Sequence, residues 1–354
     1  APFELWIAPY LGVAQLFRTL CEKPFHNRLI LALVAGFSFF LPLLHWSSVY
    51  VGSIPWLVLA IGESLIFALI GIPRWSQRWE SALSFALLFT LIELLRMKAP
   101  FGGFGWGRSG FIAVDTPFSQ MLSLGGVPLA SFTVIFIGVL IYLVVLKFNY
   151  RYFPLLLIVF ANLFIPNAAS TVSNVLKVAA VQGSVPDLGL DFNSQRKAVL
   201  NNHLQLTKNW GTQANRPANF EPDLFVWPEN ASDVNPLTEA RMQISDLVNF
   251  LDKPLVVGGV GSNNSRPTNL SILWQPNETE NVTTAIYQKR ALAPFGEFMP
   301  LRSLAEFISP LAKNVTDFEA GDRAQIFSVG DAKIFPVICF EILSDRLLQQ
   351  DIGN

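Results

Sequence analysis

Apolar segments in the first 166 residues constrain the fold more than any other feature of this chain. Residues 29–51, 54–72 and 127–146 are each long enough to cross a bilayer as a helix, which needs about 20 residues. Residues 82–95 with their flanks form a fourth candidate span. Residues 5–20 are interrupted by Pro9 and could form a tilted or partial span, and residues 154–166 are short. This pattern predicts a membrane-spanning helical bundle.

The composition of the 354-residue chain agrees with a membrane location. Hydrophobic residues make up 51% of it and charged residues 14%, against roughly 25% charged residues in an ordinary soluble domain. The formal net charge of −1 comes without a basic stripe, so nucleic acid is not an expected partner. Cys21 and Cys339 fall in different regions, and we therefore expect no internal disulfide framework.

Basic residues gather in alternate loops between the candidate spans. One side carries Arg18, Lys23, Arg28, Arg74, Arg78, Lys147 and Arg151. The opposite loops carry only Lys98 and Arg108, so the first side is predicted to be cytoplasmic. The region from residue 175 lies outside the cytoplasm if residues 154–166 cross the membrane, and inside it if they do not.

Three ionisable residues lie within the candidate spans, where charge is costly and often functional. Glu93 and Arg96 are three residues apart on one helical face, so they either pair with each other or bind a lipid headgroup. Glu63 has no partner nearby in the sequence.

The chain changes character near residue 175, where polar residues become frequent. We predict three parts: a transmembrane bundle over residues 1–166, a linker over 167–174 and a polar domain over 175–354. Strands are predicted at 174–182, 223–229, 254–260, 270–275, 283–289, 325–329 and 333–339, and helices at 193–210, at 236–251 and from 341. This alternation indicates a layered α/β domain, which places its chemistry at strand ends.

Three of the predicted strands end on reactive side chains: the carboxylate Glu229, the amine Lys289 and the thiol Cys339. Taken singly, they are typical of a solvated carboxylate, a surface lysine and an inert buried thiol. Taken together, they could form a catalytic set that includes a nucleophile.

The motifs around these residues carry a resemblance to a known superfamily. Trp227-Pro-Glu229, Tyr287-Gln-Lys289 and Ile338-Cys-Phe-Glu341, in this order, resemble the nitrilase (carbon–nitrogen hydrolase) superfamily, whose catalytic set is Glu, Lys and Cys. Together with the membrane spans, the chain is similar to the apolipoprotein N-acyltransferase family. Further matching stretches are Val181-Gln-Gly183, Pro294-Phe-Gly-Glu-Phe-Met-Pro300, the Glu93 and Arg96 pair, and Gly103-Phe-Gly-Trp106.

The resemblance implies a nitrilase-like αββα sandwich over residues 175–354 and acyl transfer in two steps. The Cys339 thiol would take a fatty acyl chain from a membrane phospholipid as a thioester. It would then pass the chain to the N-terminal α-amine of a diacylglyceryl-modified apolipoprotein. Glu229 would be the general base and Lys289 the cation that stabilises the oxyanion. No metal and no cofactor are expected.

The same resemblance implies supporting roles for Glu297, which would help hold the site, and Glu341, which would orient the nucleophile's loop. Trp106 and Phe340 are candidate substrate-binding residues, although Trp106 could equally be an interfacial anchor. Phe340 stands where some members have tyrosine, a change we expect to be tolerated. The resemblance also implies a multi-pass protein of the bacterial cell membrane, with its catalytic domain on the extracytoplasmic face.

The family's domain continues well beyond the cysteine, so we expect this chain to be truncated at both ends and its sandwich to be incomplete at the C-terminus. Two alternatives stay open. One is a membrane-tethered, nitrilase-type amidase that hydrolyses a small amide. The other is a non-catalytic or transporter-like bundle in which Glu63, Glu93 and Arg96 line a polar path.

Overall fold

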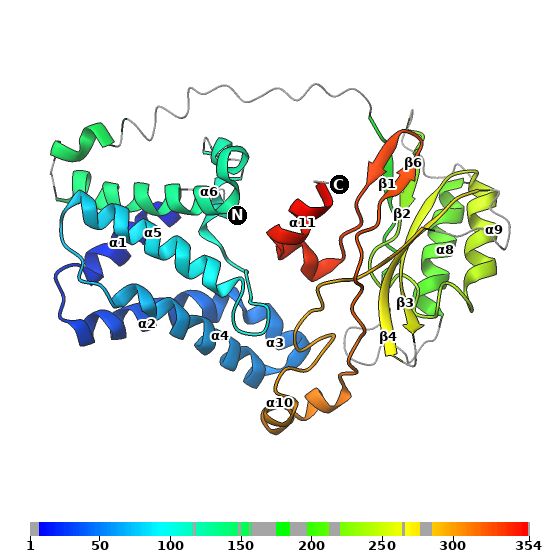
Figure 1. The fold of residues 1–354 in the computed structure, drawn as a ribbon, viewed down its shortest axis with the longest axis horizontal. Helices are drawn as coiled ribbons and strands as arrows, with labels where there is room; N and C mark the ends of the chain where they lie inside the picture. Colours follow the sequence, from blue (N-terminus) through cyan, green and yellow to red (C-terminus); the bar gives the residue numbers. More distant parts are fainter. Residues whose placement is uncertain are drawn as a thin grey trace. The chain divides into compact units, whose positions relative to one another are not determined.

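The computed structural model divides into two compact units, Ala1–Ser170 and Thr171–Asn354 (Figure 1). It describes residues 7–114, 116, 118–147, 150–155, 157, 175–184, 197–211, 220–263, 266–276 and 285–352. The predicted linker over 167–174 and most of the candidate span over 154–166 lie outside these residues.

The regular elements in the described part of the first unit are all helical. Its α-helices are α1 (Ala8–Leu20), α2 (Phe25–Leu43), α3 (His45–Val51), α4 (Ser53–Phe67), α5 (Trp79–Arg96) and α6 (Gln120–Ile141). Shorter helical turns are η1 (Ala68–Gly71), η2 (Ser109–Ala113), η3 (Tyr142–Leu146) and η4 (Tyr150–Tyr152). Among the described residues, three segments are long and apolar enough to cross a membrane: Phe25–Leu43, Ser53–Gly71 and Gln120–Val145. The prediction of membrane helices is thereby confirmed for these three segments.

Two predicted spans are less regular than expected. Residues 29–51 lie in two helices, α2 and α3, which are separated by Leu44, whose φ of −98° and ψ of 5° are not helical. The longer helix α6 is kinked at Gly125 and Gly126, where Gly126 has a φ of 63° that glycine tolerates better than other residues.

The membrane unit packs large rings between small residues. Phe17 is fully buried, and its ring lies 5.1 Å from that of Phe85 and 5.6 Å from that of Tyr142. Five buried alanines in this core let the helices approach closely. They are Ala14, Ala32, Ala60, Ala82 and Ala86.

The buried ionisable groups of this unit are paired differently from the sequence interpretation. Arg96 forms an ion pair with Glu63 across α4 and α5, and not with Glu93 on its own helix. The Arg96 guanidinium also donates a hydrogen bond of 2.9 Å to the carbonyl of Trp106. Glu93 instead accepts hydrogen bonds from the backbone N–H and hydroxyl of Ser109, both at 2.7 Å. These contacts fix the segment after α5 to the helices.

The second unit is built on a five-stranded sheet in the order β1-β2-β3-β4-β5. The strands are β1 (Val178–Ala180), β2 (Leu224–Val226), β3 (Leu255–Asn263), β4 (Arg266–Trp274) and β5 (Ala285–Gln288). The first three are parallel to one another, whereas β4 runs antiparallel to both β3 and β5. This mixed sheet in the second unit, together with the apolar helices of the first unit, agrees with the predicted combination of membrane helices and an α/β domain.

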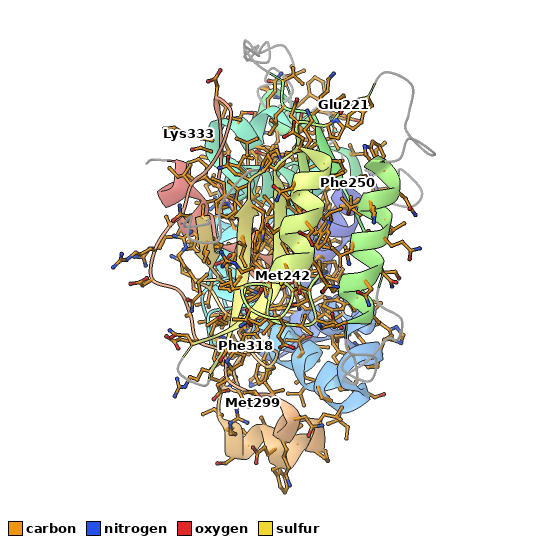
Figure 2. All side chains as sticks on the ribbon, turned by 90° about the vertical axis from the view of Figure 1, so that its right-hand side faces the viewer. Glu221, Met242, Phe250, Met299, Phe318 and Lys333 are labelled. Atoms are coloured by element: carbon orange, nitrogen blue, oxygen red, sulfur yellow. The ribbon has the colours of Figure 1, made fainter. Side chains whose placement is uncertain are left out.

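Two helices, α8 (Ala198–Gly211) and α9 (Arg241–Leu251), cover one face of this sheet (Figure 1). Their apolar sides join the buried core through Leu200, Ile244 and Leu247. Met242 and Phe250 lie on the outer side of α9, toward the viewer in Figure 2, and are 75% and 52% exposed.

The other face of the sheet packs against a hairpin formed by β6 (Phe327–Val329) and β7 (Ala332–Ile334). The other helices among the described residues of this unit are α10 (Arg302–Ile308), which was not predicted, η7 (Pro310–Asn314), η8 (Cys339–Leu343) and α11 (Asp345–Ile352). The strand predicted over 333–339 ends at Ile334, because Pro336 cannot donate to a ladder. Cys339 therefore begins a helical turn and does not end a strand.

Candidate active site

Glu229 is held by the two residues before it. The Trp227 side chain is 2% exposed, and its indole N–H donates a 2.9 Å hydrogen bond to the Thr207 hydroxyl on α8. The Trp227 backbone N–H donates to the carbonyl of Val256 on β3 at 2.8 Å. Pro228 restricts the backbone between Trp227 and Glu229. The fixed position of Trp227 therefore also fixes the backbone from which the Glu229 side chain extends.

Gly258 on β3 lets the Glu229 segment approach the sheet closely. A Cβ at Gly258 would clash with the Pro228 carbonyl oxygen and lie 2.8 Å from the Glu229 Cα. The Gly258 carbonyl accepts a 3.1 Å hydrogen bond from the Ser232 N–H, which closes the segment on the strand. Only glycine fits this position without moving Glu229.

Strand register brings Lys289 next to Asn269. Leu270 on β4 pairs with Gln288 on β5, and the following N–H of Lys289 donates to the Asn269 carbonyl at 2.9 Å. The Lys289 carbonyl accepts a 2.8 Å hydrogen bond from the Gly321 N–H. These backbone bonds keep the amine inside the domain, where the side chain is 1% exposed.

An ammonium and an amide bridge the same two carboxylate oxygens at this site. The Lys289 Nζ lies 2.8 Å from Glu297 Oε1 and 3.2 Å from Glu229 Oε1. The Asn269 Nδ2 donates to the same oxygens, at 2.8 Å and 2.6 Å respectively. Asn269 was not predicted as a site residue, because it belongs to no motif. Its place next to Lys289 follows from the pairing of β4 with β5.

The charges of this cluster keep Lys289 protonated. Burial alone lowers the pKa of the Lys289 amine. The hydrogen bond to Glu297 and the negative charges of Glu229 and Glu297 outweigh burial, so the pKa of Lys289 is raised above its ordinary value. Lys289 is thus a fixed cation at neutral pH.

Glu297 is fixed by its own loop. Its second oxygen, Oε2, accepts a 2.7 Å hydrogen bond from the Ala293 N–H, and its carbonyl accepts one of 2.7 Å from the Phe318 N–H. The residue is 8% exposed. Since both carboxylate oxygens are engaged, Glu297 is suited to hold Lys289 in place.

Cys339 is exposed and lies where the backbone has a φ of 49°, in the left-handed region. Partial burial of the thiol raises its pKa, as do the negative charge of Glu229 and a hydrogen bond with that carboxylate, while Lys289 acts in the opposite direction. The net pKa is raised, so the thiol is neutral at pH 7 and needs a base to react.

Glu341 connects the segment after Lys289 with the turn that carries Cys339. Its Oε1 accepts hydrogen bonds from the Tyr287 hydroxyl at 2.7 Å, the Arg290 N–H at 2.6 Å and the Ala291 N–H at 3.1 Å. Its Oε2 accepts one of 2.9 Å from the N–H of Ile338, directly before Cys339. At 1% exposure, Glu341 is a buried structural link in the site.

Beside the thiol lies a largely apolar cavity of about 260 Å³. Glu229 and Cys339 contribute to its lining, and most of the rest is aliphatic or aromatic. Apolar lining residues include Val226, Val256, Leu270, Phe327 and Ile338. The Cys339 thiol and the Glu229 carboxylate therefore face a space that favours hydrocarbon over water.

The structure gathers Glu229, Lys289, Glu297, Glu341 and Cys339 in one network of contacts in the second unit. Phe340 follows Cys339 and is half-buried. Trp106 belongs to the membrane unit, where its ring is 43% exposed and lies 5.5 Å from the ring of Trp46. Within the described residues, no three His, Cys, Asp or Glu side chains are grouped as a metal site would need.

Comparison with known proteins identifies the chain's relatives. Residues 1–140 match the family model of the apolipoprotein N-acyltransferase N-terminal domain. The whole chain is 31% identical to the apolipoprotein N-acyltransferase of Mycolicibacterium smegmatis and covers 65% of that protein. It is similar to the proteins of the same name from Rickettsia prowazekii (26% identity over 86% of this chain and 64% of that protein) and Azotobacter vinelandii (27%, 97% and 70%).

These matches extend over both units, so the likeness includes the segments that carry Glu229, Lys289 and Cys339 as well as the membrane helices. The first two of these relatives are longer than this chain, which spans about 65% of their length. On its sequence, the chain is similar to members of the apolipoprotein N-acyltransferase family, along its whole length for the Mycolicibacterium smegmatis protein and over residues 1–140 for the family's N-terminal domain.

Proposed function

We propose that this chain carries the catalytic site of a membrane acyltransferase that moves a fatty acyl chain from a phospholipid to the N-terminal α-amine of a diacylglyceryl-modified apolipoprotein. The observation that carries the proposal is the Lys289 cation, held by Glu229 and Glu297 beside the neutral thiol of Cys339. The family relationship supplies the substrate classes. The second unit would then be the nitrilase-like αββα domain.

In the first half-reaction, the Cys339 sulfur attacks the ester carbonyl of the phospholipid, and Glu229 takes the thiol proton. The carbonyl oxygen becomes an oxyanion near Lys289. An ammonium has three N–H bonds, and two of them bind Glu229 and Glu297. The third has no partner among the described residues and is available to the oxyanion. The C–O bond then breaks, the proton passes from Glu229 to the leaving oxygen, and a thioester and a lysophospholipid result.

In the second half-reaction, the α-amine of the lipoprotein attacks the thioester carbonyl. Glu229 takes a proton from the attacking nitrogen, an amide bond forms, and the C–S bond breaks. The proton returns to the sulfur, which restores the Cys339 thiol. The order of events is that of a ping-pong enzyme, because the lysophospholipid leaves before the amine enters.

The remaining assignments are also part of this proposal. Glu297 would hold Lys289, and Glu341 would fix the nucleophile's turn. Phe340 and Trp106 would contact the lipid substrates. The protein would cross the bacterial cell membrane several times, with its catalytic domain on the extracytoplasmic face.

The intact mass of the purified protein tests the first half-reaction. After incubation with a phospholipid, we expect a mass increase of one acyl group that hydroxylamine removes, since hydroxylamine cleaves thioesters. Cys339→Ala should show no increase, whereas Cys21→Ala, a matched change of the other cysteine, should keep it. An adduct that survives in Cys339→Ala, or no adduct on the wild-type protein, would contradict the proposal.

A peptide pair tests the second half-reaction. A diacylglyceryl-cysteine peptide with a free α-amine should discharge the acyl-enzyme and gain its acyl chain. The same peptide acetylated at that amine should leave the adduct intact. Hydrolysis of small amides in the absence of lipid, together with no transfer to the free amine, would favour the amidase alternative.

A further inference from the structure

A polar groove lies in the membrane unit, along the loop between η1 and α5 and the first turns of α5. Its volume is about 580 Å³. Side chains that line it include Arg74, Trp75, Ser76, Arg78, Ser81 and Ser84. The loop lies on the side of the membrane whose connecting loops carry most of the basic residues. The positive-inside rule assigns this side to the cytoplasm.

The loop that forms the groove is fixed by buried side chains. The Arg28 guanidinium, 6% exposed, donates hydrogen bonds to the carbonyls of Gly71 at 3.0 Å and Ile72 at 2.9 Å. The indole N–H of buried Trp75 donates to the Ile70 carbonyl at 2.8 Å. The backbone that carries the two groove arginines is therefore ordered without using their side chains.

Arg74 and Arg78 are exposed in the groove and form no ion pair with any described residue. Beside them, the hydroxyls of Ser76 and Ser81 lie 2.9 Å apart, and one of the two has a proton to donate elsewhere. The groove includes one carboxylate, Glu80, so two positive charges face one negative charge. Guanidinium groups and hydroxyls are the donors that bind phosphate in proteins.

We propose that this groove binds the phosphate of an anionic phospholipid headgroup. Basic pockets on the cytoplasmic side of membrane helices are suited to such lipids. Apolar surface for the lipid chains is provided by Leu88 in the groove wall, and Trp79, 42% exposed at the start of α5, is of the type that sits at headgroup level. The proposal concerns lipid binding alone and does not depend on acyl transfer.

Native mass spectrometry of the full chain in detergent tests the site. The probes are phosphatidylglycerol and phosphatidylcholine with identical acyl chains, so that only the headgroup charge differs. We expect Arg74→Gln combined with Arg78→Gln to weaken phosphatidylglycerol binding about 25-fold, since one basic residue near a membrane surface contributes about five-fold. Arg18→Gln removes a basic residue on the same side outside the groove and should change binding by less than about two-fold.

A second variant keeps the test independent of the arginines. Glu80→Gln removes the groove's carboxylate and should tighten phosphatidylglycerol binding. Equal binding of the two lipids, unchanged binding in the double variant, an equal loss in Arg18→Gln, or weaker binding in Glu80→Gln would overturn the proposal. Inorganic phosphate that displaces the lipid at equal concentration would overturn the lipid assignment and show a site for free phosphate.

Discussion

Replacing Asn269 by leucine tests whether this buried amide positions the proposed base. Leucine has a similar volume and can occupy the space, but it cannot donate to Glu229 or Glu297. Lys289 would remain the single donor between the two carboxylate oxygens. The Glu229 carboxylate, which is 27% exposed, would then be free to turn away from Cys339.

The expected size of the effect follows from the lost contacts. Asn269 donates two hydrogen bonds to ionised carboxylates, at 2.6 Å and 2.8 Å. Each such bond contributes roughly 1.5–3 kcal/mol to the free energy of unfolding. The buried Asn269 Oδ1 has no hydrogen-bond partner among the described residues, so its removal regains about 1–3 kcal/mol of this free energy. Partial exposure of Glu229 reduces the loss further. We expect a net destabilisation of roughly 2 kcal/mol.

The effect on acylation should be larger than the effect on stability. A well-placed general base raises a reaction rate about 10²–10⁴-fold, and a misplaced base keeps part of this enhancement. We therefore expect acyl-enzyme formation in Asn269→Leu to slow roughly 10- to 100-fold. The assay is the single-turnover rate of the hydroxylamine-labile adduct by intact mass, measured on protein that is folded by circular dichroism.

Asn263→Leu is the matched control for this variant. Asn263 also donates to a carboxylate, Glu319, at 3.0 Å, but that bond is exposed on the β3 to β4 hairpin. We expect the control to keep the wild-type rate within about two-fold, because exposed pairs contribute little. An Asn269→Leu rate equal to that of wild type, or equal losses in both variants, would refute the reasoning.

Three further variants probe the same site. Glu229→Gln should lower the pKa of the Cys339 thiol, because it removes a negative charge and a hydrogen bond that raise this pKa. Alkylation of Cys339 by iodoacetamide would then begin at lower pH, and acylation would be lost. An unchanged or higher pH for the onset of alkylation would contradict this prediction. Gly258→Ala should slow acylation at least about ten-fold by displacing Glu229, whereas Gly62→Ala, where a Cβ meets nothing within 4 Å, should not. Glu341→Gln should destabilise the domain by roughly 2–4 kcal/mol, seen as a lower thermal midpoint, and an unchanged midpoint would argue against its role as a link.

The positions of Glu229 and Lys289 at strand ends could be predicted, because each follows a strand that the sequence marks clearly. Glu229 comes three residues after β2, and Lys289 directly follows β5. Cys339 was placed at the end of a strand, but Pro336 ends the ladder early and the thiol sits on a helical turn. The catalytic role of Cys339 stays a prediction, whereas the strand predicted to end at this residue is wrong.

Long-range partners were not predictable, because they depend on strand register and helix packing. Asn269 gains its role from the pairing of β4 with β5, which brings its carbonyl to the Lys289 N–H. Arg96 was expected to pair with Glu93 or a headgroup, yet it binds Glu63, which lies 33 residues away on α4. Sequence spacing within one helix cannot show which neighbouring helix faces an arginine.

The charges of Glu229, Glu297 and Lys289 determine how readily the Cys339 thiol loses its proton. Two carboxylates, Glu229 and Glu297, share one ammonium, so the site holds two negative charges against one positive charge. Partial burial, and after it this excess of negative charge, raise the pKa of the Cys339 thiol, so a preformed thiolate is disfavoured. A neutral thiol reacts slowly with oxidants and with water-borne electrophiles. In the proposed mechanism, the thiol becomes a nucleophile only as Glu229 takes its proton, and that transfer is favourable when the carbonyl oxygen of an acyl group next to Lys289 takes up negative charge as the C–S bond forms. The carboxylate that disfavours the thiolate at rest would therefore be the group that activates the thiol when a substrate is bound.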